Sequence, residues 1–181
     1  KEHVIQMVQL YRQRYEYYGH GKAHQAYVAL GGQAFMREKS QDAWNEFRPY
    51  FDNAPVYGHG PSMEDFTKMT PLTVGSPEQV IERTLEFRDW VGDYQRQMFL
   101  VDHAGLSTKT VLEQIDLFGE KVLPVLRQEF AKGRLEDVPE APTHDFLKAR
   151  QAAGKAPIAG GGEGSQAFLD RQKAQEEAPK E

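Results

Sequence analysis

The chain has 181 residues, of which 39% are hydrophobic, a net charge of −5 at pH 7 and no cysteine. The charge argues against a general nucleic-acid binder, which needs a basic face, and the lack of cysteine excludes disulfides, thiolate metal ligands and cysteine nucleophiles. There is no apolar run of about 18 residues and no visible signal peptide, so we expect a cytoplasmic protein that makes no use of a membrane.

The N-terminal part of the chain predicts a helix, a strand and a second helix. Apolar residues recur at helical spacing between residues 4 and 18. The run AYVAL at residues 26–30 is typical of a buried strand, and Gly31 and Gly32 should end it. Residues 40–51 then predict a short helix that its internal proline should stop or kink.

The middle of the chain predicts a loop followed by a capped helix. Residues 52–73 contain three prolines and no sustained period, which favours a loop. Ser76 can cap the next helix, and Gln79 completes a capping box. A helix N-terminus that follows Gly75 could also bind an anion, so the sequence leaves two interpretations open, a plain helix start or a phosphate site.

The C-terminal half begins with a second buried strand, RQMFLV at residues 96–101. A long helix follows, with apolar residues on one side between Val111 and Phe130 and an expected kink near Gly119, because Pro124 lies inside it. Residues 134–181 hold four prolines and few large apolar side chains, so they cannot build a core. We expect an extended or disordered tail there.

Two apolar pairs, Phe146-Leu147 and Phe168-Leu169, could anchor this tail on a surface. The rest of the pattern, strands that alternate with helices, indicates an α/β fold with a parallel sheet. Two strands would leave two open edges, so further strands must come from another chain or from a longer protein. The start at Lys1, inside a helical pattern, also leads us to expect a fragment or a processed product.

Three stretches carry a resemblance to a known family. They are VGSPEQVIE at residues 74–82, FLVDHAG at 99–105 and VLEQIDLFGEKVLPVLRQEF at 111–130. Together they resemble the C-terminal end of the luciferase-like flavin-dependent monooxygenases. The resemblance covers residues 1–133 and not the tail at 134–181.

The resemblance implies a (β/α)8 barrel, of which this chain supplies the C-terminal part. Residues 26–30 would form the seventh strand, 96–101 the eighth, and 36–74 a lid-like insertion between them. The family binds FMN, which NAD(P)H reduces directly or through a partner reductase, and uses it with oxygen to oxygenate a small organic substrate. The implied partners are the N-terminal part of the barrel, in the same or a separate chain, and further copies in a homo-oligomer.

Two histidines are candidates for catalysis. His103 follows the expected eighth strand, at the end of a barrel where active sites lie, and could bind flavin or substrate or donate a proton. His59 lies between glycines in the expected lid. For each, an ordinary solvated loop histidine is the alternative interpretation. His20 and His24 flank Gly21 with no clear helix between them, so we expect no metal site.

Four residues are candidates for cofactor binding. Gly31 and Gly32 could make room for a flavin ring, or form only a tight turn. Gly75 and Ser76 could hold the phosphate, or only start a helix.

Two other functions remain open on the sequence. The chain could be a non-catalytic, barrel-derived subunit that completes or stabilises a partner. It could also be a helical interaction module with no relation to flavin. Because the family's main flavin contacts lie on earlier strands, we expect no activity from this fragment alone.

Overall fold

The structure is a computed structural model that describes residues 1–55, 57, 59–138 and 144–154. The chain divides into two units, one made of Lys1 and Ala29–Arg134 and the other of Glu2–Val28 and Leu135–Glu181. The first unit contains the sheet and the candidate site.

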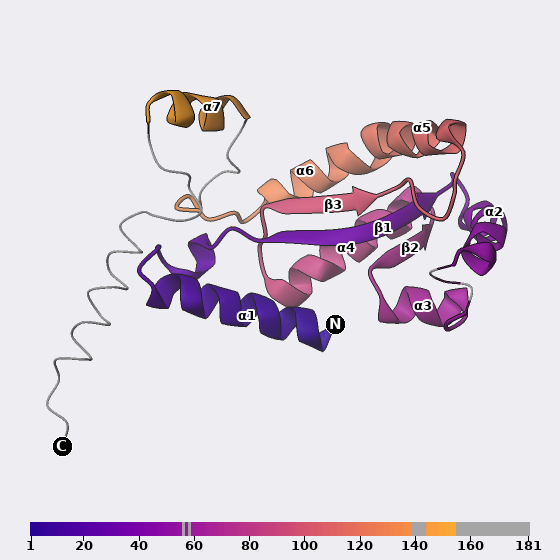
Figure 1. Cartoon of the computed structure of the whole chain (residues 1–181), viewed down its shortest axis with the longest axis horizontal. Helices are drawn as coiled ribbons and strands as arrows, with labels where there is room; N and C mark the ends of the chain where they lie inside the picture. Colours follow the sequence, from indigo (N-terminus) through magenta and orange to yellow (C-terminus); the bar gives the residue numbers. More distant parts are fainter. Residues whose placement is uncertain (56, 58, 139–143, 155–181) are drawn as a thin grey trace, which may run out of the picture. The chain divides into compact units, whose positions relative to one another are not determined.

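Three parallel strands form the sheet of the first unit (Figure 1). They are β1 (Ala29–Met36), β2 (Leu72–Gly75) and β3 (Arg96–Leu100), and their order is β2-β1-β3. Phe35 pairs with Val74 on one side of β1, and Gly31 pairs with Met98 on the other. The expected parallel α/β arrangement is therefore confirmed, in an open sheet.

Helices cover both faces of this sheet. They are α2 (Ser40–Asn53), α3 (Met63–Met69), α4 (Pro77–Val91), α5 (Thr108–Leu117), the π-helical turn η2 (Phe118–Val122) and α6 (Leu123–Ala131). On one face, Phe35 packs with Phe47 and Phe51 of α2 and with Met63 of α3. On the other face, Ala34 and Met36 pack against side chains of α4, η2 and α6, among them Val80, Val122 and Leu126. Successive residues of β1 thus point into two separate cores, as the alternation of a strand requires.

The structure corrects the expected loop at residues 52–73. It contains α3 and the first half of β2, whose residue Leu72 is buried. This strand is only four residues long and follows Pro71, so its sequence resembles a loop; pairing with β1 decides its conformation. The sheet has three strands, and the expectation of two was wrong.

The first strand also lies further along the chain than expected. Gly31 and Gly32 are inside β1 rather than at its end, and the strand continues to Met36. A Cβ atom on Gly32 would lie 3.2 Å from Nε2 of Gln97 on the neighbouring strand, so the small residue serves strand packing. Pro49 does not stop α2, which continues to Asn53. The irregularity expected near Gly119 takes the form of the π-helical turn η2.

The second unit contains α1 (Glu2–Tyr17), the short 3-10 helix η1 (Ala23–Gln25) and α7 (His144–Ala152). Nε2 of His24 lies 2.9 Å from Oδ1 of Asp137, and the amide of Gln25 donates to the Asp137 carbonyl. These bonds join η1 to the start of the expected tail.

The proposed tail anchors receive no test from the structure. The backbone of Phe146-Leu147 belongs to α7, but their side chains, like the whole of Phe168-Leu169, lie outside the described residues. Within the part of the chain that the structure describes, no helix combines the length and the apolar character needed to cross a membrane.

Candidate functional site

The strand order defines one crevice in the first unit. The chain leaves β1 toward β2 on one side and then crosses back to β3 on the other, so the connections diverge at the carboxyl ends of β1 and β3. In open α/β sheets this point is where ligands bind. A hollow of about 640 Å³, within the usual size range of ligand pockets, lies here.

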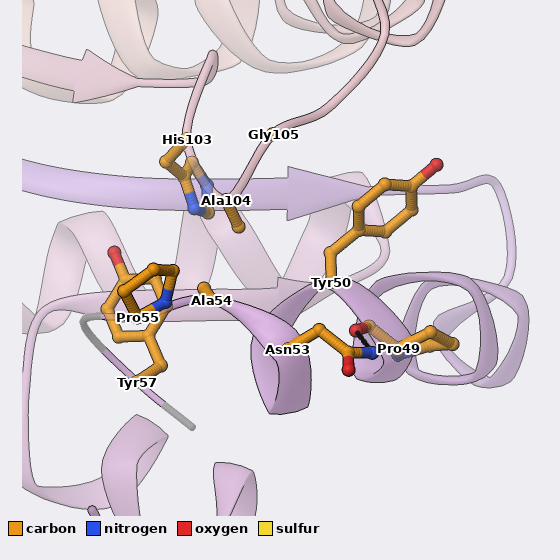
Figure 2. Close-up of a pocket in the computed structure, with 9 residues that line it drawn as sticks. All are labelled: Pro49, Tyr50, Asn53, Ala54, Pro55, Tyr57, His103, Ala104 and Gly105. Atoms are coloured by element: carbon orange, nitrogen blue, oxygen red, sulfur yellow. Dashed lines mark hydrogen bonds between the residues drawn. The ribbon is translucent and has the colours of Figure 1, made fainter. Parts of the chain in front are cut away.

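Figure 2 shows the hollow between the last turn of α2 and the turn that follows β3. Its described lining is Pro49, Tyr50, Asn53, Ala54, Pro55, Tyr57, His103, Ala104 and Gly105. The site therefore combines aromatic and small residues with one imidazole and one carboxamide.

His103 is buried at the end of β3, with 6% of its surface exposed. Its Nε2 lies 3.4 Å from the carbonyl oxygen of Ala34 on β1. The paired part of β3 ends at Leu100, opposite Gln33, so the Ala34 carbonyl has no strand partner on that side. The imidazole replaces the missing strand and satisfies a buried carbonyl.

Gln114 of α5 likewise takes the place of a neighbouring strand, two residues further along β1. Its Oε1 accepts a 2.6 Å hydrogen bond from the Met36 N–H, and its Nε2 donates a 2.9 Å bond to the Met36 carbonyl. The side chain is fully buried. It thus fixes α5 to the end of β1, close to the Ala34 carbonyl that His103 contacts.

The hydrogen bond to Ala34 also determines the tautomer of His103. A carbonyl can only accept, so Nε2 carries the proton and Nδ1 is left as an acceptor. Nδ1 is buried and has no hydrogen-bond partner among the described residues. Burial lowers the pKa of the imidazole, which favours its neutral form near neutral pH. The site therefore presents an unused hydrogen-bond acceptor.

The turn after His103 has an unusual backbone. Ala104 has a φ of 61° and Gly105 a φ of 77°, both in the left-handed region. Glycine adopts this conformation freely, but alanine does so at a cost, so Ala104 stores strain at the rim of the hollow. Such outliers cluster at functional sites, which is consistent with a site at this turn.

The opposite wall is held by an aromatic cluster. The rings of Tyr57 and Phe51 stack with centroids 5.1 Å apart, and Phe66 packs edge-on against both. Phe47, from the same core, contacts the His103 ring edge-on at 5.0 Å. These ring contacts fix the positions of the aromatic side chains on this wall.

The structure separates the two candidate histidines. His103 lines the hollow, whereas His59 is exposed in the segment before α3 and does not belong to the described lining. Gly31 and Gly32 lie in the amino-terminal half of β1, away from its carboxyl end. The structure therefore does not bring these three residues together with His103.

Gly75 and Ser76 have a structural explanation. The Ser76 N–H donates a 3.0 Å bond to Oε1 of Gln79, as the capping box predicts. A Cβ atom on Gly75 would lie 2.1 Å from the same oxygen, so glycine is required there by the cap. A hydrogen bond from Ser76 lowers the pKa of Glu78, which keeps a negative charge beside this helix start. A phosphate at this position would meet an occupied N–H and a carboxylate.

Tyr50, Asn53 and Tyr57 are site residues that the sequence analysis missed. An aromatic residue at helical spacing usually indicates a core position, and Asn53 falls in the segment expected to be a loop. The position of α2 directly after β1 indicates only that its first turn lies near the carboxyl edge of the sheet, so no local signal identified the residues of its last turn.

The described residues fit one end of FMN and not the other. The buried acceptor of His103 and the aromatic wall suit a flat ring that carries N–H groups. Phosphate recognition needs cationic side chains or free backbone N–H groups, and the described lining offers no such cation. The described part of this site therefore contains no cationic side chain that would bind the phosphate.

The fold and the hollow define a parallel α/β protein with a ligand-sized site at the carboxyl edge of its sheet. A comparison of the chain with models of known protein families and with curated proteins finds no match.

Proposed function

We propose that this chain is the C-terminal part of a cytoplasmic, FMN-dependent luciferase-like monooxygenase that oxygenates a small organic substrate. The observation that carries the proposal is the hollow beside His103, which lies where the strand of the FLVDHAG stretch ends. The resemblance assigns the same end of the same strand to the active site.

The pairing of β1 with β3 also supports the proposal. The resemblance makes them the seventh and eighth strands of a barrel, which are neighbours in such a fold, and they pair in parallel here. β2 occupies the other edge of β1, where a sixth strand would pair. A (β/α)8 barrel built on this sheet must therefore close around β2 or displace it.

The proposal divides the cofactor between two parts of the assembly. This chain would contact the ring end of FMN and the substrate through His103 and the aromatic wall. The N-terminal part of the barrel, in the same or another chain of a homo-oligomer, would hold the phosphate. When bound and reduced by NAD(P)H, FMN would supply the oxygenation chemistry, and Nδ1 of His103 would orient a donor group beside it.

A non-catalytic subunit is the second candidate function. The lack of a cationic side chain in the described lining favours it, because a chain that only completes a partner's barrel needs no cofactor contact of its own. The two functions differ in whether His103 touches flavin.

Flavin titration distinguishes the two functions. FMN and riboflavin share the ring and differ in the phosphate, so this chain should quench the fluorescence of both with dissociation constants within about twofold. His103→Gln should weaken both, and His59→Gln, in the exposed segment, should change neither. Circular dichroism checks that each variant is folded. Absence of quenching, or His103→Gln binding like the parent protein, would contradict the catalytic proposal.

A further inference from the structure

The hollow beside His103 has a charge and hydrogen-bonding character that selects among possible substrates. We infer that it takes an uncharged organic substrate that carries a hydroxyl or N–H group, which donates a hydrogen bond to Nδ1 of His103, and that it rejects carboxylates and sulfonates. The inference rests on the proposed function and names the substrate class of the same site.

The acceptor role of Nδ1 follows from the strand ends. β3 stops before it can cover the Ala34 carbonyl, and the Nε2–H of His103 donates to that oxygen instead. A neutral imidazole with a protonated Nε2 can only accept at Nδ1. Nδ1 is buried without a partner in the described part of the chain, and an unsatisfied buried acceptor is costly. A ligand that supplies a donor removes this cost, whereas a ligand that only accepts does not.

The rejection of anions follows from the lining. The described residues around the hollow include no lysine or arginine to pair with a carboxylate or a sulfonate. Asp102, next to His103, contributes a negative field at the imidazole. Burying an unpaired anion beside a negative charge is strongly unfavourable. Uncharged ligands face neither penalty.

The shape of the hollow adds an apolar requirement. Tyr57 is held in the stacked cluster with Phe51, and Ala54 and Pro55 present apolar surface beside it. A volume of about 640 Å³ accommodates an aromatic ring with substituents. Because Nδ1 is closed off from solvent, entry of the donor requires a small movement of the lining, and the strained turn at Ala104 is the part suited to it.

Three probes that share one aromatic ring test the inference on the full chain in its purified assembly. Benzyl alcohol carries a donor, benzyl methyl ether carries only an acceptor, and benzoate carries a charge. The readout is the nitrogen-15 NMR signal of the His103 imidazole, titrated with each probe without added flavin. Because no flavin is added, a failed flavin titration would overturn only the proposed function, and a failed probe titration would overturn only the present inference.

We expect benzyl alcohol to shift the Nδ1 signal of His103. The ether should bind about tenfold more weakly, which corresponds to the loss of one hydrogen bond to a buried acceptor, and benzoate at least as weakly. Asn53→Lys, which adds a cation at an exposed position on the rim, should strengthen benzoate binding about fivefold relative to benzyl alcohol binding. Equal binding of alcohol and ether, benzoate binding as tight as that of the alcohol, or no response to any of the three overturns the inference.

Discussion

Replacing Gln114 with leucine should destabilise the first unit severely, because this side chain substitutes for a missing strand. Gln114→Leu keeps the side-chain volume but removes both hydrogen bonds to Met36, at 2.6 Å and 2.9 Å. Each bond is worth about 1 kcal/mol net, and each buried backbone group left unsatisfied costs about 1–3 kcal/mol. Because the variant leaves two buried groups of Met36 unsatisfied, the free energy of unfolding should fall by about 2–6 kcal/mol.

Urea denaturation followed by circular dichroism measures this loss. Gln41→Leu is the matched control, because Gln41 is exposed on α2 and its amide donates a hydrogen bond to the exposed side chain of Asn45 on the same helix. We expect the control to change the free energy of unfolding by less than about 0.5 kcal/mol. A loss below about 1 kcal/mol for Gln114→Leu would refute the claim that side chains replace β3 along the end of β1.

Three further predictions follow from other described contacts. Burial lowers the pKa of His103 below its unfolded value of about 6.5. The protein should therefore lose stability as the pH falls below that value, because the unfolded state then binds the proton more readily. Between pH 7 and 5, the melting temperature of His103→Gln should fall less steeply than that of the parent protein. Arg88 donates hydrogen bonds of 2.8 Å to the carbonyls of Glu129 and Lys132 and so caps the C-terminal end of α6. Arg88→Lys should lower the free energy of unfolding, measured by urea titration, by about 1–2 kcal/mol. An unchanged urea midpoint would contradict this capping role. Residues 52–73, which belong to the lid-like insertion expected at 36–74, should gain protection from amide hydrogen exchange when benzyl alcohol binds, and equal exchange in both states would count against gating.

The sequence predicted those features that depend on local chemistry. The capping box at Ser76 and Gln79 forms as expected, because all of its atoms lie within one helical turn. The parallel α/β class followed from the alternation of helices with apolar runs. His103 was found because it follows a strand directly.

The features that escaped prediction depend on pairing between distant segments. β2 becomes a strand only beside β1, and β1 runs through Gly32 because it pairs with β3, where Gly32 lies opposite Phe99. Gln114 is indistinguishable in sequence from an exposed helix residue, since nothing local indicates that it will meet Met36. The wall of the hollow likewise depends on which side of β1 each strand takes, and short-range patterns do not encode that choice.

Native mass spectrometry of the purified protein tests the central claim most directly. If the chain is part of a flavin-dependent barrel, its 20.6 kDa mass should appear in an assembly with a second polypeptide or a second copy, together with the mass of FMN. The assembly should bind FMN more tightly than this chain does after the two parts are separated, because the described lining of the hollow offers no cationic side chain for the phosphate. A folded 20.6 kDa monomer that carries no flavin, even after incubation with FMN, would contradict the account.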